Sequence, residues 1–577
     1  MKVLVIGGVA AGTKAAAKIK RQNRGAEVKI LTQSADISYA GCGLPYYVGG
    51  MIESREELIV NTPEKYTGLT GVEVVTRCEV TSVDFQAKTV TALCQGQTWM
   101  ESYDKLVIAT GATPFVPQVE GIRLPGVFTM RTPDDAIALR AYVQDRHCRS
   151  AVVVGAGFIG LEIAENLQAQ GLAVTVIDAA DQILPKIFDP EMAGYARRRL
   201  RQNGIRVLTG TPLNEITGTE RADGVLANGS RISADLVVLA IGIRPATSFL
   251  NGSGLAMEKG AIVVDEMMRT NISDVYAAGD CALVRNQQTH QPQWSAMGST
   301  ANITARALAC TMTGTEMPYG GCLGTGVVRL GEGFNAGRTG LTEAQAREAG
   351  YEPVTVVCAS DDKAHYYPGS SFFMTKLIAD RSTHQLLGIQ VLGSAVDKMV
   401  DIAVTGIAAG MTLEAFNSLD YSYAPPFSTA IHPFVQACLV LENKLSGAMS
   451  SMTPADYANG AAKDYQVVDV LPKPTIAGAK WVDLAQVNGP IEGLERDAKL
   501  LLVCNRGRRA YLLQNRLRHF GYTQTVVLEG GVAMNEVKVQ FAGAAIPPDE
   551  IKRVKGLGCL QDKRYPDRFN VRVITRN

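Results

Sequence analysis

Two stretches of the chain repeat one order of apolar and polar positions. Residues 2–6, KVLVI, form a nearly unbroken apolar run, which is typical of a strand buried in a parallel sheet. The glycine-rich turn GGVAAG follows at 7–12, and residues 13–21 have the pattern of a helix. A strand, a glycine turn and a helix together aim backbone N–H groups at a pyrophosphate. The pattern therefore predicts a dinucleotide-binding opening, although Val9 stands where GxGxxG has its middle glycine.

The second opening, at 151–180, has the complete glycine spacing. An apolar strand leads into Gly155, Gly157 and Gly160, a helix follows, and a second strand ends at Asp178. A carboxylate at that position accepts the ribose 2′-hydroxyl and repels a 2′-phosphate. This opening therefore favours NADH over NADPH.

Three later segments fit a chain that passes between two such domains. ATGATPFVP at 109–117 and LAIGIRPAT at 239–247 each end a strand in a glycine turn, as crossovers between domains do. In NISDVYAAGDCA, a strand precedes Gly279 and Asp280, whose carboxylate is placed to hold a ribityl hydroxyl. In this order the segments predict two bound dinucleotides.

The composition of the chain indicates which kinds of molecule it binds. The 577 residues suffice for three to five domains, and the net charge of +1 provides no broad cationic field for nucleic acid or an anionic membrane. Eleven cysteines without CxxC spacing are typical of a reduced cytoplasmic protein, in which most thiols pack as small apolar groups. We expect a cytoplasmic chain without a signal peptide, a membrane span or a metal site, and with small-molecule partners.

Cys42 lies between two glycines in SYAGCGLPYYVGG, residues 38–50. It is a buried packing residue, half of a disulfide, or a nucleophile that works alone. A helix opening at LPYYVGG would lower the pKa of the thiol through its dipole. A lone thiol serves as a two-electron centre if it cycles through a mixed disulfide, a persulfide or a sulfenic acid.

Over about residues 1–450 the chain resembles the two-dinucleotide flavoprotein disulfide reductases. It looks closest to their single-cysteine branch of coenzyme A disulfide reductases, coenzyme A persulfide or polysulfide reductases, and NADH oxidases and peroxidases. Dithiol members carry a second cysteine five residues on, where this chain has Tyr47. The resemblance implies FAD and NADH as cofactors, with binding residues Gly7, Gly8, Gly12, Thr110, Gly111, Gly279 and Asp280 for FAD, and Gly155, Gly157, Gly160, Glu162 and Asp178 for NADH.

Two further motifs, HYYPG at 365–369 and DYSYAPPFS at 420–428, resemble the dimerisation segments of the coenzyme A branch. The resemblance implies a homodimer in which Tyr423 acts as a proton donor toward the partner's cysteine, together with Tyr366 or Tyr367. It also implies coenzyme A as substrate or bound ligand. The matching coenzyme A contacts are Arg21, Ser38 and Asn302, whereas Gly41 replaces the usual asparagine and TAIHPF lacks the usual lysine.

The C-terminal part resembles a rhodanese-like sulfurtransferase module. A buried strand delivers Cys504 into CNRGRRA, where Arg506, Arg508 or Arg509 add positive charge, and Asp469 ends the preceding strand. A loop of this kind stabilises thiolate and persulfide anions. The alternative is a docking domain with a buried cysteine. Residues 541–577, including Cys559, match no pattern that we can interpret.

The expected fold is α/β, with two Rossmann-like domains, an α+β dimerisation domain and a rhodanese-like α/β domain. The expected boundaries are 1–112 with 246–320 for FAD, 113–245 for NAD(H), 321–447 for dimerisation, 448–455 for a linker, 456–540 for the rhodanese-like domain and 541–577 for a tail. We expect an NADH-dependent reductase of coenzyme A disulfide, coenzyme A persulfide or polysulfide, with Cys42 as redox thiol and Cys504 as sulfur carrier. The alternatives are an NADH oxidase or peroxidase, and a sulfur-delivery protein with donor or acceptor protein partners.

Overall fold

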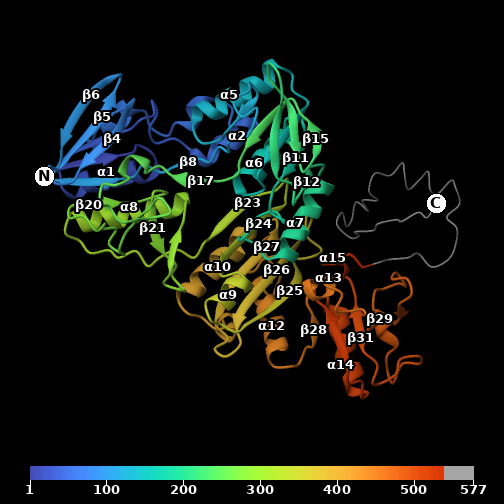
Figure 1. The fold of residues 1–577 in the computed structure, drawn as a ribbon. Coiled ribbons are helices and arrows are strands. Elements are labelled where there is room, and N and C mark those ends of the chain that lie inside the picture. Colours follow the sequence, from blue (N-terminus) through green and yellow to red (C-terminus); the bar gives the residue numbers. More distant parts are fainter. Residues whose placement is uncertain (538–577) are drawn as a thin grey trace. The chain divides into compact units, whose positions relative to one another are not determined.

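The computed structural model describes residues 1–537 and divides the chain into two compact units (Figure 1). The first unit contains Met1–Pro185 and Arg197–Gly331, and the second contains Lys186–Ala196 and the described residues from Glu332 onward. Among the described residues, no helix is both long and apolar enough to cross a membrane.

The N-terminal sheet of the first unit is parallel. Its strands, in order across the sheet, are β20 (Val275–Ala277), β7 (Lys105–Ile108), β1 (Lys2–Ile6), β2 (Glu27–Leu31) and β3 (Glu73–Val75). Helix α1 (Ala10–Gln22) begins within the glycine-rich segment 7–12 and packs against α8 (Gly298–Met312). The predicted strand at 2–6 and the helix after it are confirmed, and the helix begins three residues earlier than expected.

A second parallel sheet repeats this arrangement in the same unit. Its strands, in order, are β12 (Arg206–Leu208), β11 (Ala173–Ile177), β10 (Ser150–Val154), β16 (Leu236–Leu239) and β9 (Val127–Phe128). The helices of this region are α5 (Pro133–Asp145), α6 (Phe158–Ala169) and the part of α7 (Pro190–Gln202) that begins at Arg197. The two predicted crossovers form β8 (Ala112–Pro114) and β17 (Ile243–Pro245), which pair antiparallel, so the chain enters and leaves this domain side by side.

Smaller sheets complete the first unit. They are β4 (Cys78–Asp84), β5 (Thr89–Cys94) and β6 (Gln97–Ser102); β13 (Leu213–Gly218), β14 (Ala222–Ala227) and β15 (Ser230–Ser233); and β18 (Met257–Glu258), β19 (Ala261–Val263), β21 (Ala282–Arg285) and β22 (Pro292–Trp294). Short helices α2 (Leu44–Val48), α3 (Arg55–Leu58) and α4 (Pro63–Thr70) lie between β2 and β3 in the sequence.

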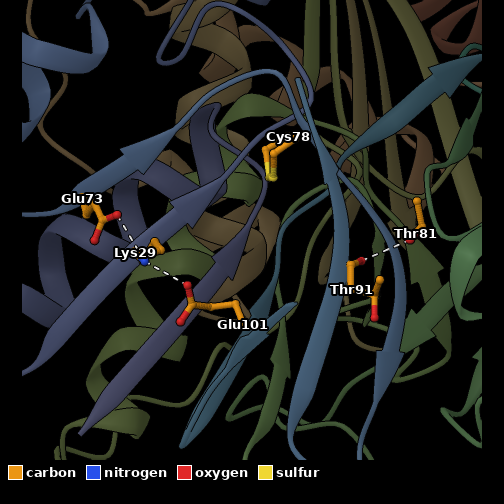
Figure 2. Close-up of a disulfide and its surroundings, with 7 residues drawn as sticks. Lys29, Glu73, Cys78, Thr81, Thr91 and Glu101 are labelled. Atoms are coloured by element: carbon orange, nitrogen blue, oxygen red, sulfur yellow. Dashed lines mark hydrogen bonds and ion pairs between the residues drawn. A yellow bond between two sulfur atoms is a disulfide. The ribbon is translucent and has the colours of Figure 1, made fainter. Parts of the chain in front are cut away.

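Cys78 and Cys94 are an exception to the expectation that most of the eleven thiols are reduced and pack as small apolar groups. Cys78 and Cys94 are directly opposite in the pairing of β4 with β5 and are joined by a disulfide, with their Cα atoms 4.0 Å apart (Figure 2). Sequence spacing alone gave no sign of this pairing because 16 residues and a hairpin separate the two thiols. Lys29 of β2 pairs with Glu73 of β3 in its own sheet at 3.2 Å and with Glu101 of β6, in the sheet of the disulfide, at 2.9 Å (Figure 2).

The second unit begins with an antiparallel sheet. Adjacent strands are β24 (Asn335–Gly340), β27 (Leu386–Gly393), β26 (Phe372–Asp380) and β25 (Pro353–Asp361). The helices of this region are α9 (Glu343–Glu348), α10 (Val396–Ala408), α11 (Leu413–Asn417) and α12 (Pro433–Leu445). Strands β26 and β27 are almost wholly buried, as an α+β layer requires.

A buried lysine ties several segments of this region together. The ammonium of Lys376 in β26 lies 2.9 Å from Asp189, 2.6 Å from Glu191 and 2.7 Å from Glu343. These carboxylates also lie close enough to one another to form a cation site, and Lys376 supplies a positive charge among them. The three negative charges offset the burial of the ammonium and raise the pKa of Lys376.

A five-stranded parallel sheet ends the described chain. Its order is β28 (Ser451–Met452), β32 (Thr525–Leu528), β31 (Leu500–Val503), β29 (Gln466–Asp469) and β30 (Lys480–Trp481), with helices α13 (Pro454–Ala458), α14 (Arg508–His519) and α15 (Gly531–Met534). Residues 448–455, predicted as a linker, contain the edge strand β28 and the start of α13. The sequence did not indicate this strand, because two residues are too few to show an alternation of apolar and polar positions.

Candidate active site

Cys42 lies at the start of a short helical segment in the first unit. Gly41–Gly43 form a 3-10 turn that runs directly into α2, so the predicted helix after the cysteine is present. The thiol residue is exposed in the single chain. Gly43 allows close packing here, because a Cβ at that position would approach the Cδ1 of Ile52 to 3.0 Å. Cys42 is therefore neither a buried packing residue nor part of the disulfide.

The charges around Cys42 oppose ionisation, which corrects the predicted effect of the helix dipole. Although the residue is exposed, neighbouring atoms partly shield its sulfur from water. This desolvation is the largest influence and raises the pKa of the thiol, and Glu162 and Asp280 raise it further. Arg131 acts in the other direction. A five-residue helix contributes too little to reverse the effect of burial and two carboxylates.

Tyr47, five residues after Cys42, is a packing residue. Its side chain is 9% exposed, and the Arg140 guanidinium lies 4.5 Å from its ring centroid. Arg140 also donates hydrogen bonds to three backbone carbonyls of this segment, among them that of Tyr47 at 3.3 Å. The position that holds a second cysteine in dithiol relatives is thus filled by a cation–π pair.

Helix α6 packs closely against the cysteine segment. A Cβ at Gly49 would lie 2.1 Å from Oδ1 of Asn166, a fully buried residue of α6. The Tyr46 hydroxyl donates to Glu162 of the same helix at 3.1 Å. Burial raises the pKa of Glu162 to about 7, and the hydrogen bond from Tyr46 moderates that increase. Glu162, predicted from the NADH motif, therefore also belongs to the surroundings of Cys42.

The first glycine turn is shaped for a pyrophosphate. A Cβ on Gly7, whose φ is +112°, would meet the Ala109 carbonyl at 2.1 Å, and one on Gly12 would meet the Gly7 carbonyl at 1.9 Å. Gly8 is also crowded, since a Cβ there would lie 2.9 Å from Ile37. No side chain caps the N-terminus of α1, which leaves its first N–H groups available. These features fit the FAD that the sequence predicts.

The remaining predicted FAD residues follow β7 and β20. Thr110 and Gly111 come directly after β7, and Gly279 and Asp280 follow β20. The Asp280 carboxylate accepts a hydrogen bond from Nη2 of Arg131 at 2.8 Å, so the predicted ribityl ligand carries an ion pair. A Cβ on Gly111 would lie 3.3 Å from the same nitrogen. Sequence reasoning missed Arg131, which lies in a segment without a motif, far along the chain from Asp280.

The second glycine turn repeats the close packing of the first. A Cβ on Gly155 would lie 2.3 Å from the Ala240 carbonyl, and one on Gly160 would lie 1.9 Å from the Gly155 carbonyl. Gly157 is the N-cap residue before α6, so no side chain caps the first N–H groups of this helix. The Asp178 carboxylate accepts hydrogen bonds from the backbone N–H groups of Ala156 at 2.6 Å and Ala180 at 2.8 Å. The carboxylate is thus fixed at the end of β11, where a nucleotide ribose lies in such folds.

The predicted coenzyme A contacts are spread over three elements of the first unit. Arg21 is exposed in the last turn of α1, and Asn302 is exposed in α8, where its Nδ2 donates to the Gly298 carbonyl at 2.8 Å. Ser38 adopts a positive φ of 49°, and its hydroxyl accepts from Asn61 at 3.4 Å. Helices α1 and α8 pack together, so Arg21 and Asn302 lie on neighbouring helices.

The predicted tyrosines lie on the surface of the second unit. Tyr366, Tyr367 and Tyr423 are 66%, 38% and 50% exposed, which excludes a role as buried core residues in the single chain. A hydrogen bond with Tyr423 raises the pKa of Tyr366. Phe427 and Ile431 are exposed as well, at 66% and 55%. Large exposed apolar side chains in one region are typical of a protein interface.

Cys504 lies in the expected loop between β31 and α14. Its thiol accepts a hydrogen bond from the N–H of Gly507 at 3.1 Å, and the residue is 2% exposed. Gly531 packs against the loop so closely that a Cβ there would lie 2.1 Å from the Cys504 carbonyl. Asp469 ends β29 as predicted and accepts backbone hydrogen bonds from Leu471, Thr475 and Ile476.

Two of the three arginines of this loop, Arg506 and Arg509, are already engaged. Arg506 pairs with Asp361 at the end of β25 and lies 4.7 Å from the ring centroid of Phe372 in β26. Arg509 donates to the carbonyl of Val470 at 2.8 Å, whereas Arg508 is exposed. The loop of Cys504 is thus attached to the antiparallel sheet of its own unit. Cys559 and the rest of the tail lie outside the described residues.

The comparisons with known proteins agree with this geometry. The family model described as pyridine nucleotide-disulphide oxidoreductase matches residues 1–301, and the model of its dimerisation domain matches residues 333–434. An NADH oxidase of Methanocaldococcus jannaschii is 33% identical over 450 residues, which are 77% of this chain and 100% of the relative. An NAD(P)H coenzyme A polysulfide/persulfide reductase of Pyrococcus horikoshii is 34% identical over 442 residues, 76% of this chain and 98% of the relative.

Two solved structures extend the likeness into the C-terminal sheet. An NAD-dependent persulfide reductase from A. fulgidus has a TM-score of 0.88 and 34% identity, covering 92% of this chain and all of that one. The reduced CoADR-RHD of Bacillus anthracis has a TM-score of 0.87 and 30% identity, covering 92% of this chain and 97% of that one. The predicted fold class is thereby confirmed, including the extra C-terminal α/β domain.

Proposed function

The chain belongs to the pyridine nucleotide-disulphide oxidoreductase family, and on that premise we propose that it is an NADH-dependent flavoprotein that reduces coenzyme A disulfide, coenzyme A persulfide or polysulfide at Cys42. The observation that carries the proposal is the setting of Cys42. Cys42 is exposed, and its thiol is close enough to Glu162 and Asp280 for their charges to raise its pKa; these two residues belong to the two predicted cofactor sites. Tyr47 occupies the position at which a second cysteine would stand.

In the proposed reaction the Cys42 thiolate attacks a sulfur of the substrate. With coenzyme A persulfide, a mixed disulfide between Cys42 and coenzyme A forms, the S–S bond of the persulfide breaks, and hydrosulfide leaves. FAD, which Gly7, Gly8, Gly12 and Asp280 would hold, would supply the two-electron reduction with electrons from NADH. Cleavage of the mixed disulfide would return the Cys42 thiolate and release coenzyme A thiolate. Tyr423 of the partner subunit, in a homodimer, protonates the departing sulfur, assisted by Tyr366 or Tyr367.

We divide the chain for this function as the sequence suggests. Residues 1–112 with 246–320 bind FAD, residues 113–245 bind NADH, and residues 321–447 form the dimer contact. The exposed tyrosines together with Phe427 support the dimer contact. The rhodanese-like domain carries sulfane sulfur on Cys504, which the N–H of Gly507 supports as an anion.

The proposal is tested with Cys42→Ser, using Cys148→Ser, another free cysteine of the first unit, as the matched control. NADH consumption is followed separately with coenzyme A disulfide, coenzyme A persulfide, polysulfide and oxygen. We expect Cys42→Ser to lose turnover on the sulfur substrates and the control to retain it. Full persulfide reduction by Cys42→Ser would refute the cysteine mechanism.

The NADH oxidase alternative is supported by the M. jannaschii relative named above. It requires Cys42 to cycle through sulfenic acid, and oxygen or peroxide must then be consumed faster than any persulfide. The variant Cys504→Ala distinguishes the sulfur-delivery alternative from the reductase proposal. If the variant no longer transfers sulfur to an acceptor but still carries out NADH-linked reduction, the result supports sulfur delivery. Equal loss of both activities instead supports a shared persulfide intermediate.

A further inference from the structure

A cavity of about 210 Å³ opens in the second unit, between the starts of two helices. Ala395, the N-cap of α10, and Pro433, the first residue of α12, both line it. The apolar part of its wall includes Phe373 and Met399. The cavity is smaller than a typical cofactor pocket, so its size suits a small molecule.

One buried hydroxyl in this cavity lacks a hydrogen-bond partner. Ser428 lines the cavity and is only 3% exposed, and its Oγ makes no hydrogen bond within the described part of the chain. An unpaired buried hydroxyl is costly, and most such groups in native proteins have a partner. The unsatisfied Oγ therefore points to a ligand with a polar group.

The charges that line the cavity favour an anion. Lys398 donates only a long hydrogen bond of 3.5 Å to the Phe427 carbonyl and makes no ion pair among the described residues. Asp362 is the carboxylate of the lining, and it already accepts from the N–H of Ser371 at 2.8 Å and from the hydroxyls of Ser371 and Ser394 at 3.0 and 2.8 Å. Lys363, 3.9 Å from Asp362, adds a second ammonium group.

The two helix starts add to this preference. Both α10 and α12 are 13 residues long, and no side chain caps the N-terminus of α10. Helix N-termini attract negative charge. His432, the N-cap of α12, contributes no charge at neutral pH, because burial and Lys398 lower its pKa to about 4.

We propose that this cavity binds a small organic anion, with its anionic group beside Ser428 and Lys398 and its short apolar body against Phe373 and Met399. Short-chain carboxylates and sulfonates belong to this class. All residues that line the cavity belong to the second unit, and the proposal does not depend on the roles proposed for Cys42 and Cys504.

Isothermal titration of the full-length, FAD-loaded dimer tests the proposal with three probes. 1-Butanesulfonate carries both parts of the expected ligand, inorganic sulfate carries the charge alone, and 1-butanol carries the apolar body alone. We expect butanesulfonate to bind at least about tenfold more tightly than either of the other probes, because it engages both parts of the site. Equal binding of sulfate and butanesulfonate, or binding of none of the probes, overturns the proposal.

Variants locate the site. Lys398→Met removes an exposed charge and keeps the side-chain length, and Ser428→Ala removes the unpaired hydroxyl; we expect each to weaken butanesulfonate binding by about tenfold. Lys463→Met, which removes an exposed lysine outside the cavity, is the matched control and is expected to bind as the wild type does. Because Lys398 is exposed, its variant folds even if Ser428→Ala does not. Unchanged binding by Lys398→Met refutes the assignment.

Discussion

At the scale of single residues, Glu162 links pH to the reactivity of Cys42. Its pKa of about 7 means that the carboxylate is charged above that pH and largely neutral below it. When charged, it raises the pKa of the Cys42 thiol. Glu162→Gln is therefore expected to speed alkylation of Cys42 by about three- to tenfold at pH 8 and to change it little at pH 6, since one pKa unit changes the thiolate fraction tenfold.

The rate is measured by mass spectrometry of the Cys42 peptide after timed reaction with iodoacetamide. Tyr46→Phe is the control, because it removes the hydrogen bond that lowers the Glu162 pKa and keeps the carboxylate. The pH at which alkylation changes should rise in that variant. Equal acceleration by Glu162→Gln at both pH values would contradict the assignment.

Asp178 is the residue that we propose to determine the choice between NADH and NADPH. Two backbone N–H groups fix its carboxylate, and a fixed negative charge at the ribose repels a 2′-phosphate. Asp178→Ser should lower the ratio of kcat/KM for NADH over NADPH by at least about tenfold, which corresponds to about 1.4 kcal/mol. Asp181→Asn, an exposed carboxylate three residues on, is the control and should leave the ratio unchanged.

The sequence was most informative where chemistry depends on local spacing. The glycines at 7, 12, 155 and 160 were found from their turns, and each meets backbone closely enough to exclude a side chain. Arg131 and the Cys78–Cys94 pair were missed, because their partners are distant in the chain or lie across a strand pair. The raised pKa of Cys42 was missed for the same reason, since two of its causes, Glu162 and Asp280, come from other elements.

At the scale of elements, α2, which directly follows the turn of Cys42, packs against α6, the helix that we propose to bind NADH. Gly49→Ala would drive a methyl group into the buried amide of Asn166, and such overpacking costs about 1–3 kcal/mol. We expect a lower unfolding midpoint and slower reduction of Cys42. The double variant Gly49→Ala/Asn166→Ala restores space and should recover part of the loss, so a strictly additive double variant would contradict this contact.

The attachment of the rhodanese-like domain to the antiparallel sheet depends on Glu529. This residue is 3% exposed and accepts from Lys444 at 2.7 Å, from the Ser451 hydroxyl at 2.6 Å and from the Val357 N–H at 2.8 Å. Removing one charge of a buried pair typically costs about 3–5 kcal/mol. Glu529→Gln should therefore strongly lower the unfolding midpoint of the second unit.

Asp361→Asn serves as the comparison. The Asp361–Arg506 pair is about one-third exposed on each side, so its loss should cost no more than about 1 kcal/mol. For both variants, the rate of limited proteolysis is measured in the connection between the antiparallel sheet and the C-terminal sheet. Equal sensitivity of the two variants would show that Glu529 does not hold this attachment.

At the scale of the whole molecule, the exposed tyrosines predict active sites shared between two subunits. Co-expression of Cys42→Ser with Tyr423→Phe chains gives dimers of which half are mixed, and a mixed dimer contains one intact site only if Tyr423 acts on the partner's Cys42. If Tyr423 acts across the dimer, about a quarter of wild-type activity should return from two weakly active variants. Activity no higher than the mean of the two variants would place Tyr423 and Cys42 in the same subunit's site.

The edge strand β28 determines where a fragment that contains only the C-terminal domain should begin. It hydrogen-bonds to β32, whose residues are TVVL, and thereby covers the open side of that strand. A fragment that begins at residue 456, the boundary suggested by the sequence, would expose an apolar strand with unpaired backbone groups. Such an edge recruits a second copy of itself, so that fragment is expected to aggregate, whereas one beginning at residue 448 is expected to remain monomeric.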